Sequence, residues 1–362
     1  MTDKQIYQIG LTMINGVGDI LARHLLEALG DAEAVFTEKR QSLEKISGIG
    51  DSIIAEIKRA DVLLRAEKEL AFAQKNGISI YFLKDMNYPE RLRECPDAPV
   101  LFYFKGNADL NAAHIISVVG TRRASAYGQE VTERLLRDLS VIFPDLLVVS
   151  GLAYGIDICA HRNALAHGLD RIYPPVHRST AVEMLERGGL LTDFPSGTNP
   201  DRQNFIRRNR IVAGLADATI VIESAEKGGS LITADIAFSY GRDVYAFPGR
   251  VTDINSKGCN GLIRQNKGGL ITCADDLIMA MRWDVAQKTD ALPVQTQLLF
   301  PENEESERIL SFLEMRKESH INELSVALNL PVHQLSSLLF ELELDGKIKS
   351  MPGSIYKRMK PL

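Results

Sequence analysis

Three short loops hold the residues best suited to chemistry, and each directly follows an apolar run typical of a buried strand. They comprise residues 120–125 (GTRRAS), 150–155 (SGLAYG) and 227–230 (KGGS). Glycine and serine at the start of a helix offer backbone N–H groups and hydroxyls to anionic oxygens, and the helix dipole favours negative charge there. Arg122, Arg123 and Lys227 add full positive charge. The loops therefore predict a binding site for a polyanion.

A fourth segment, residues 202–211, reads RQNFIRRNRI and contains four arginines and one phenylalanine. Guanidinium groups bind phosphates and an aromatic ring can stack on a base, so this composition is typical of nucleic-acid binding. Taken alone, the segment is better explained as a solvated helix face with Phe205 in the core. Beside the three loops, we interpret it as part of a nucleic-acid site.

No motif for catalysis accompanies the loops. The dinucleotide fingerprint GxGxxG with a later acidic residue is absent, and so is the phosphate loop GxxxxGK[ST]. Several residues of catalytic type stand singly, without the clustered carboxylates of a two-metal nuclease or a recognisable triad spacing. They are Asp157, Asp217, Glu223, Asp235, His161, Ser150 and Ser230. We therefore predict a site without catalytic residues, metal or cofactor.

The loops must be positioned by a sheet, because apolar runs alternate with glycine turns and helical segments from residue 114 onward. The runs HIISVVG, DLLVVSG, ATIVIES and DVYAFPG predict parallel strands covered by helices on both faces, a Rossmann-like α/β architecture. Ligands of such sheets bind at the carboxyl ends of the strands, where the loops fall. Two further strands, ISIYFL and VLFYFKG, are predicted within residues 77–106.

The first 76 residues are helical in pattern and contain a repeated turn. Gly16 and Gly18 precede one amphipathic helix, and Gly48 and Gly50 precede another. The repeat resembles the helix-hairpin-helix, which binds the DNA backbone without sequence preference, and these four glycines are possible backbone-binding turns. No Lys or Arg lies in the turns, so a small SAM-like helical domain that docks a protein is an equal alternative.

The end of the chain is predicted to form a separate small domain. Residues 284–305 are polar and contain proline, which indicates a linker. Residues 306–362 give three helical segments and a glycine-turned hairpin with a basic end, an order that resembles a winged helix. The acidic sequence ELELD on the third helix favours protein docking over DNA binding.

Composition and length limit the classes of protein to which the chain can belong. The chain has 362 residues, 45% of them hydrophobic, and a net charge of −5, which leaves room for a local basic groove. No run of about 18 apolar residues and no signal peptide is present, so we expect a cytoplasmic protein without membrane contact. Four widely spaced cysteines without a CxxC pair are predicted to be packing thiols.

Five ordered motifs in residues 77–283 resemble the DNA-processing protein A family, also called DprA or Smf. They are VVGTRRASAYG, SGLAYGIDICAHRNAL, FIRRNRIVAGLAD, KGGSLITADIAFSYGRDVYAFPG and GCNGLIRQNKGG. The resemblance implies a non-catalytic single-stranded DNA-binding protein. It further implies a homodimer that protects incoming DNA and loads the RecA recombinase during natural transformation and recombination.

The loops and the resemblance together assign a DNA-binding site. Its predicted members are Gly120, Thr121, Arg122, Arg123, Ser150, Gly151, Arg202, Phe205, Arg208, Asn209, Lys227, Gly229 and Ser230. Arg202 stands three positions before the motif phenylalanine, where the family tends to place a Lys or Arg.

One departure from the family concerns the sheet. The family usually places a glycine turn and an apolar strand between its AHRxAL helix and its GLDxxYP motif, but here Leu165 is followed directly by AHGLDRIYPP. Either roughly ten residues are missing from the sequence, or the sheet has lost a strand. A lost strand would leave ladder hydrogen bonds unmade, which favours the first explanation.

The alternative function is an enzyme acting on a nucleotide monophosphate through the same phosphate-binding loops. Phosphoribohydrolases with related sheets carry a PGGxGT loop followed by a catalytic Glu. Here the nearest Pro-Gly is Pro248-Gly249-Arg250, and residues 227–230 are followed by Thr233-Ala234-Asp235 without a Glu in place. We therefore favour DNA binding.

Overall fold

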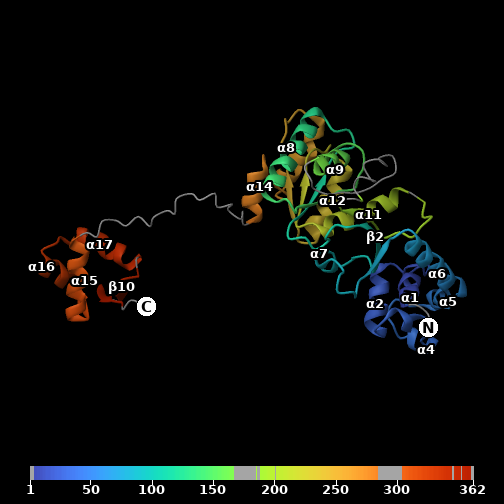
Figure 1. Ribbon diagram of the computed structural model, residues 1–362, viewed down its shortest axis with the longest axis horizontal. Helices are drawn as coiled ribbons and strands as arrows, with labels where there is room; N and C mark the ends of the chain where they lie inside the picture. The colour runs from blue at the N-terminus through green and yellow to red at the C-terminus, as the bar shows by residue number, and fades with distance from the viewer. Residues whose placement is uncertain are drawn as a thin grey trace. The chain divides into compact units, whose positions relative to one another are not determined.

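The computed structural model describes residues 4–166, 185, 188–199, 201–283, 304–344, 346–351 and 353–359. The chain divides into two compact units, Met1–Val285 and Ala286–Leu362 (Figure 1). No helix within these residues is both long and apolar enough to cross a membrane. The four cysteines are free thiols, and Cys95 and Cys259 are buried.

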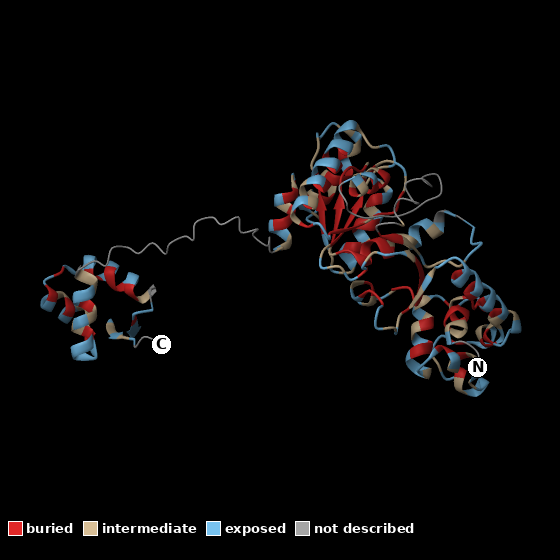
Figure 2. Cartoon of the chain, in the orientation of Figure 1, coloured by how far each residue is buried: buried red, intermediate tan, exposed pale blue. Residues whose placement is uncertain are grey.

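A parallel sheet forms the centre of the first unit, with strand order β4-β3-β6-β7-β8. The strands are β3 (Ile115–Val119), β4 (Leu147–Val149), β6 (Ala218–Val221), β7 (Asp243–Ala246) and β8 (Gly269–Leu270). Apart from β8, whose two residues are exposed, they appear as a red, buried layer in Figure 2, as expected for runs rich in Val and Ile with helices on both faces. The predicted Rossmann-like α/β fold is confirmed.

Helices cover both faces of this sheet. One face packs against α8 (Ala126–Ile142), α9 (Ile156–Ala166) and α14 (Ala274–Met281), as the shared core of Val118, Leu135 and Leu277 shows. The other face packs against α11 (Arg202–Leu215), α12 (Gly229–Ser239) and α13 (Lys257–Arg264). The sequence left open whether the sheet has lost the strand that the family places after the AHRxAL helix. That strand would follow Leu165, and residues 167–184 lie outside the described residues, so the structure does not test this question.

A small antiparallel sheet, β1-β2-β5, joins the parallel sheet to the N-terminal helices. It comprises β1 (Ser79–Phe82), β2 (Leu101–Gly106) and β5 (Gly189–Thr192), and α7 (Glu90–Arg93) lies between its first two strands in sequence. Leu101 and Tyr103 face the N-terminal helices, whereas Phe102 and Phe104 enter a second core with Tyr88. The alternation of a strand thus buries both faces.

Six helices precede this sheet: α1 (Lys4–Thr12), α2 (Asp19–Leu29), α3 (Ala32–Thr37), α4 (Arg40–Leu43), α5 (Asp51–Ile57) and α6 (Ala60–Lys75). Gly16 and Gly48 have positive φ values of 82° and 85°, a conformation that L side chains rarely adopt. Gly18 and Gly50 then begin α2 and α5 in extended conformation. The repeated turn read in the sequence is therefore present.

The second unit has the elements of a winged helix. Its helices are α15 (Glu304–Arg316), α16 (Ile321–Leu328) and α17 (Val332–Leu344), and its sheet order is β10-β11-β9. The hairpin strands are β10 (Ile348–Met351) and β11 (Ile355–Arg358), joined by β9 (Glu318–His320), which the sequence did not suggest. α15 begins at Glu304, two residues inside the predicted linker, and its first residue in the core of this unit is Ile309.

Candidate nucleic-acid interface

The carboxyl ends of β3, β4 and β6 bring the first two predicted loops into contact with each other and with Glu223. Gly155 has a positive φ of 81°, and a Cβ there would overlap the backbone of Thr121 and Arg122. Ile156 N donates a hydrogen bond to Thr121 O (3.1 Å), and Thr121 N donates to Glu223 O (2.7 Å). The first loop is therefore held between the second loop and the end of β6. We call this edge, formed by residues 120–125, 150–155 and 223–230, the rim.

The first loop offers two arginine side chains to a ligand, while three of its backbone N–H groups are hydrogen-bonded within the protein. Thr121 N donates to Glu223 O, Arg123 N donates to Thr121 Oγ1 (3.2 Å), and Ser125 N donates to Glu223 Oε2 (2.9 Å). Arg122 and Arg123 are exposed, and no ion pair within the described residues engages their guanidinium groups. These two guanidinium groups can thus meet an anion.

Glu223 closes the anion site that the start of α8 would otherwise provide. This carboxylate is 1% exposed and accepts hydrogen bonds from Ser125 N (2.9 Å) and Ser125 Oγ (2.5 Å). A Cβ on Gly128 would overlap its Oε2 atom. A negative charge from the protein itself therefore lies at the helix N-terminus, where related sheets bind phosphate. The sequence showed Glu223 only as a lone carboxylate after a strand.

The second loop is built around a buried carboxylate. A Cβ on Gly151 would lie 2.8 Å from both Asp157 Oδ2 and Arg208 Nη2, so the glycine permits their close approach. Burial raises the pKa of Asp157 to about 6, although the N–H of Ala153 and the charge of Arg208 oppose this shift. Ser150 is buried, and its hydroxyl donates to Val118 O (2.6 Å). The Ser150 hydroxyl proton is thus already used within the protein.

Helix α11 presents an aromatic ring beside this loop. Phe205 is 37% exposed, so the alternative that placed it in the core is wrong. The Arg208 guanidinium lies 5.4 Å from the centre of the Phe205 ring, a cation–π contact. Asn209 is half-buried, and the side chain of Arg202 lies outside the described residues. The contacts of Arg208 therefore connect the exposed ring to Gly151 at the rim.

The third loop leaves a helix N-terminus open. Gly228 begins α12 without a side-chain cap, and a Cβ on Gly229 would meet nothing within 4 Å. Among the described residues, the N–H groups of Gly229 and Ser230 have no hydrogen-bond acceptor. The Ser230 hydroxyl donates to Ser224 Oγ (2.9 Å), while Lys227 is exposed. Two backbone N–H groups, a helix dipole and a lysine can therefore meet an anion here.

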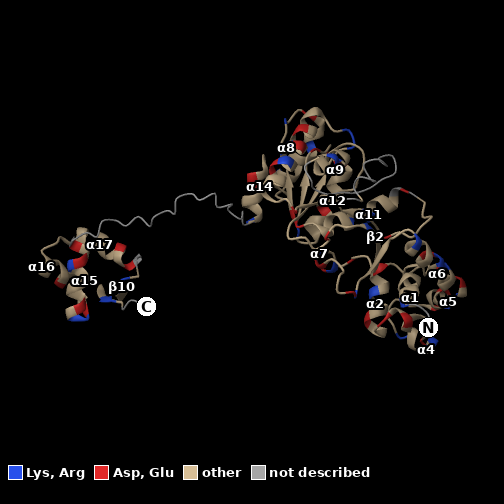
Figure 3. Cartoon of the chain, viewed as in Figure 1, with Lys and Arg blue, Asp and Glu red and all other residues tan. Residues whose placement is uncertain are grey.

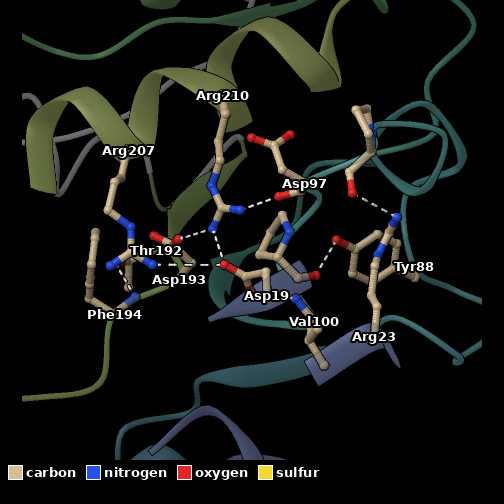
Figure 4. A network of polar contacts seen from close by, with 12 residues as sticks. Asp19, Arg23, Tyr88, Asp97, Val100, Thr192, Asp193, Phe194, Arg207 and Arg210 are labelled. Atoms are coloured by element: carbon tan, nitrogen blue, oxygen red, sulfur yellow. Dashed lines mark hydrogen bonds and ion pairs between the residues drawn. The ribbon is translucent and has the colours of Figure 1, made fainter. Parts of the chain in front are cut away.

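The glycine turns of the N-terminal helices are not brought to the rim. They lie beyond β2 from the parallel sheet (Figure 1), and Gly18 and Gly48 line a hollow of about 480 Å³ with Asp97 and Arg210. Asp19, which follows Gly18, accepts hydrogen bonds from Val100 N (3.0 Å) and Arg210 Nη2 (2.8 Å) (Figure 4). The start of α2 thus contacts protein, and a DNA-binding role of the turns stays a prediction.

Arg210 faces away from the rim, although it belongs to the arginine-rich segment. It is 7% exposed, pairs with Asp193 (2.6 Å) as well as Asp19, and donates to Asp97 O (Figure 4). On the same helix, Arg207 lies over the Phe194 ring at 5.5 Å. The segment therefore divides into a rim-facing side and a side that holds the N-terminal helices.

Comparison with known proteins assigns the chain to a family. The family model described as DNA recombination-mediator protein A matches residues 79–282, more than half of the chain. The chain belongs to this family. A second model, the DprA winged helix domain, matches residues 293–354. The first match covers the rim and α11, whereas α1–α6 lie outside both matches.

Relatives and solved structures of the DNA recombination-mediator protein A family agree with this assignment. The DNA processing protein DprA of Streptococcus pneumoniae is 37% identical over 208 residues, covering 55% of this chain and 72% of that protein. Protein Smf of Escherichia coli is 31% identical over 332 residues, covering 82% and 85%.

Among solved structures, the X-ray structure of the S. pneumoniae protein has a TM-score of 0.61 at 30% identity, covering 76% of this chain and 97% of that one. DNA processing protein A of Helicobacter pylori, described by its single-stranded DNA binding mode, has a TM-score of 0.50 at 27% identity and covers 57% and 95%.

Proposed function

We propose that the chain binds single-stranded DNA across the rim without performing chemistry on it. Phosphates contact Arg122, Arg202, Lys227 and the open N–H groups at the start of α12, while a base stacks on Phe205. One observation carries the proposal: the exposed Phe205 ring is held by Arg208, which itself lies against the glycine of the second loop. An exposed ring stacked against a guanidinium group, on a helix rich in arginine, suits an unpaired strand.

The family supports the wider role. Its description as a recombination mediator fits a protein that delivers DNA to a recombinase. The H. pylori relative is described as a single-stranded DNA binder. We therefore include in the proposal that the chain forms a homodimer, protects incoming DNA and loads RecA during natural transformation.

Glu223 restricts where the alternative, an enzyme acting on a nucleotide monophosphate, could bind its phosphate. The protein's own carboxylate fills the anion site at the start of α8, so the phosphate would have to bind at the start of α12. Incubation with AMP followed by chromatography of released adenine tests the alternative directly. We expect no release of adenine above a protein-free control. Turnover of AMP would instead support the enzyme alternative.

The test of the main proposal is the salt dependence of oligo-dT binding, followed by fluorescence anisotropy. The logarithm of the affinity should fall with the logarithm of salt concentration, with a slope of about −0.7 per phosphate contacted. Arg122→Ala and Lys227→Ala should each weaken binding to all sequences alike and flatten the slope by about 0.7. Lys39→Ala, an exposed lysine between α3 and α4, is the control with the same change of charge. A salt-independent affinity would overturn the proposal.

A further inference from the structure

Helix α6 carries an exposed basic and aromatic stripe that the function above does not use. Arg65, Lys68, Phe72 and Lys75 are all exposed, Phe72 by 45%, and at 3.6 residues per turn they fall within an arc of about 80°. We call these four residues the α6 face. The buried side of the same helix consists of Val62, Ala66, Glu69, Leu70 and Ala73. Phe72 therefore lies outside the core, among cations.

No ion pair engages the cations of the α6 face within the part of the chain that the structure describes, since no carboxylate pairs with Arg65, Lys68 or Lys75. Figure 3 shows blue positions along α6. Asp61 falls within the same arc, but Arg59 Nε already pairs with it at 2.9 Å. Three free cations with one ring on a helix about 24 Å long form a surface that suits a flexible polyanion.

The α6 face adjoins the segment that leads into α11. Glu69 is 7% exposed and accepts two hydrogen bonds from Ser196, one from its N atom (2.8 Å) and one from its hydroxyl (2.6 Å). Around the α6 axis, Glu69 lies only about 40° from Arg65 and about 60° from Phe72. Ser196 therefore lies beside the α6 face, six positions before α11 begins at Arg202.

We propose that the α6 face extends the DNA path, so that a strand leaving Phe205 at the start of α11 continues along α6. Its phosphates contact Arg65, Lys68 and Lys75, and one base stacks on Phe72. The inference rests on the proposed function, since it prolongs that path. It also gives the N-terminal helices a DNA contact that does not depend on their glycine turns.

The test compares two lengths of oligo-dT, because only a longer strand can reach both surfaces. A strand of about 6 nucleotides occupies the rim, and one of about 20 nucleotides also covers the α6 face. The triple variant Arg65→Ala/Lys68→Ala/Lys75→Ala should bind the short strand like the parent. It should bind the long strand at least tenfold more weakly in moderate salt, with a slope flatter by about 2. Phe72→Ala should weaken only the long strand, by about tenfold.

The matched control is Lys4→Ala/Lys39→Ala/Lys45→Ala, which removes three exposed lysines from other N-terminal helices and turns. Equal binding of the long strand by both triple variants would overturn the proposal, as would an equal loss for both strand lengths. If the triple variant Arg65→Ala/Lys68→Ala/Lys75→Ala lost binding to polyglutamate but kept its binding to the long strand, the α6 face would be assigned to an acidic protein segment instead. Failure of the parent to bind either strand would overturn the proposed function itself.

Discussion

The contact between Glu223 and Gly128 predicts a substitution whose effect changes sign with its background. In the parent, a methyl group at residue 128 would overlap Glu223 Oε2 and displace a carboxylate that fixes Ser125 through two hydrogen bonds. Glu223→Ala removes that carboxylate and leaves space for the methyl group. Gly128→Ala should therefore destabilise the parent but stabilise the Glu223→Ala variant.

The size of the change in unfolding free energy follows from the two hydrogen bonds between Glu223 and Ser125. Each hydrogen bond to a charged group contributes about 1.5–3 kcal/mol, and displacement of Glu223 weakens both, so Gly128→Ala should cost about 2–4 kcal/mol in the parent. In the Glu223→Ala background only the helix propensity remains, which favours Ala over Gly by about 1 kcal/mol inside a helix such as α8. The coupling between the two positions should thus be about 3–5 kcal/mol.

Urea unfolding measures this coupling, because the single tryptophan reports only the first unit. Trp283 packs against His114 and Phe143, with ring centres 4.5 Å and 5.3 Å apart. Its fluorescence should follow unfolding of the sheet without interference from the winged-helix unit. Equal costs of Gly128→Ala in both backgrounds would refute the assignment of Glu223 as the group that holds the first loop.

Two further predictions concern the carboxylates of Asp157, which is buried, and Asp19, which is half-buried. The folded-state pKa of Asp157, about 6, lies above its ordinary value of 3.8, so the folded protein binds the proton more tightly and the associated stability is lost as pH rises through 6. Relative to Asp157→Asn, the parent should lose about 2–3 kcal/mol between pH 4 and 7 by urea unfolding, and a pH-independent difference would contradict this. Asp19→Ala removes the acceptor of Val100 N and Arg210, which should cost about 2–3 kcal/mol. Hydrogen exchange should then accelerate in α1–α6 but not in α14, and uniform acceleration would contradict a local docking role.

The sheet could be predicted because its signals are local. Runs such as ATIVIES and HIISVVG are apolar throughout and end in glycine turns, so strand positions and the loops at their carboxyl ends follow from pattern alone. The turns at Gly16 and Gly48 were visible for the same reason, since each requires a conformation that favours glycine.

The roles of individual charged residues could not be predicted, because tertiary contacts decide them. Glu223 bonds to Ser125 across 98 positions of the chain, and Arg210 bonds to Asp19 across 191. In the sequence, Arg210 is one more arginine in a basic run, yet it faces the N-terminal helices while Arg208 contacts the ring of Phe205. When both sides of a helix carry arginine, residue spacing alone does not tell which arginine faces the rim and which faces the N-terminal helices.

Photo-crosslinking of DNA tests the central claim most directly, since it locates the bound strand. Oligo-dT in which one base is replaced by 5-bromodeoxyuridine crosslinks to aromatic side chains under near-ultraviolet light, and mass spectrometry of the digest identifies the modified peptide. We predict crosslinks at Phe205, lost in Phe205→Ala and reduced in Lys227→Ala. Crosslinks confined to the turns at residues 14–18 and 46–50 or to the winged-helix unit would contradict a DNA site at the rim.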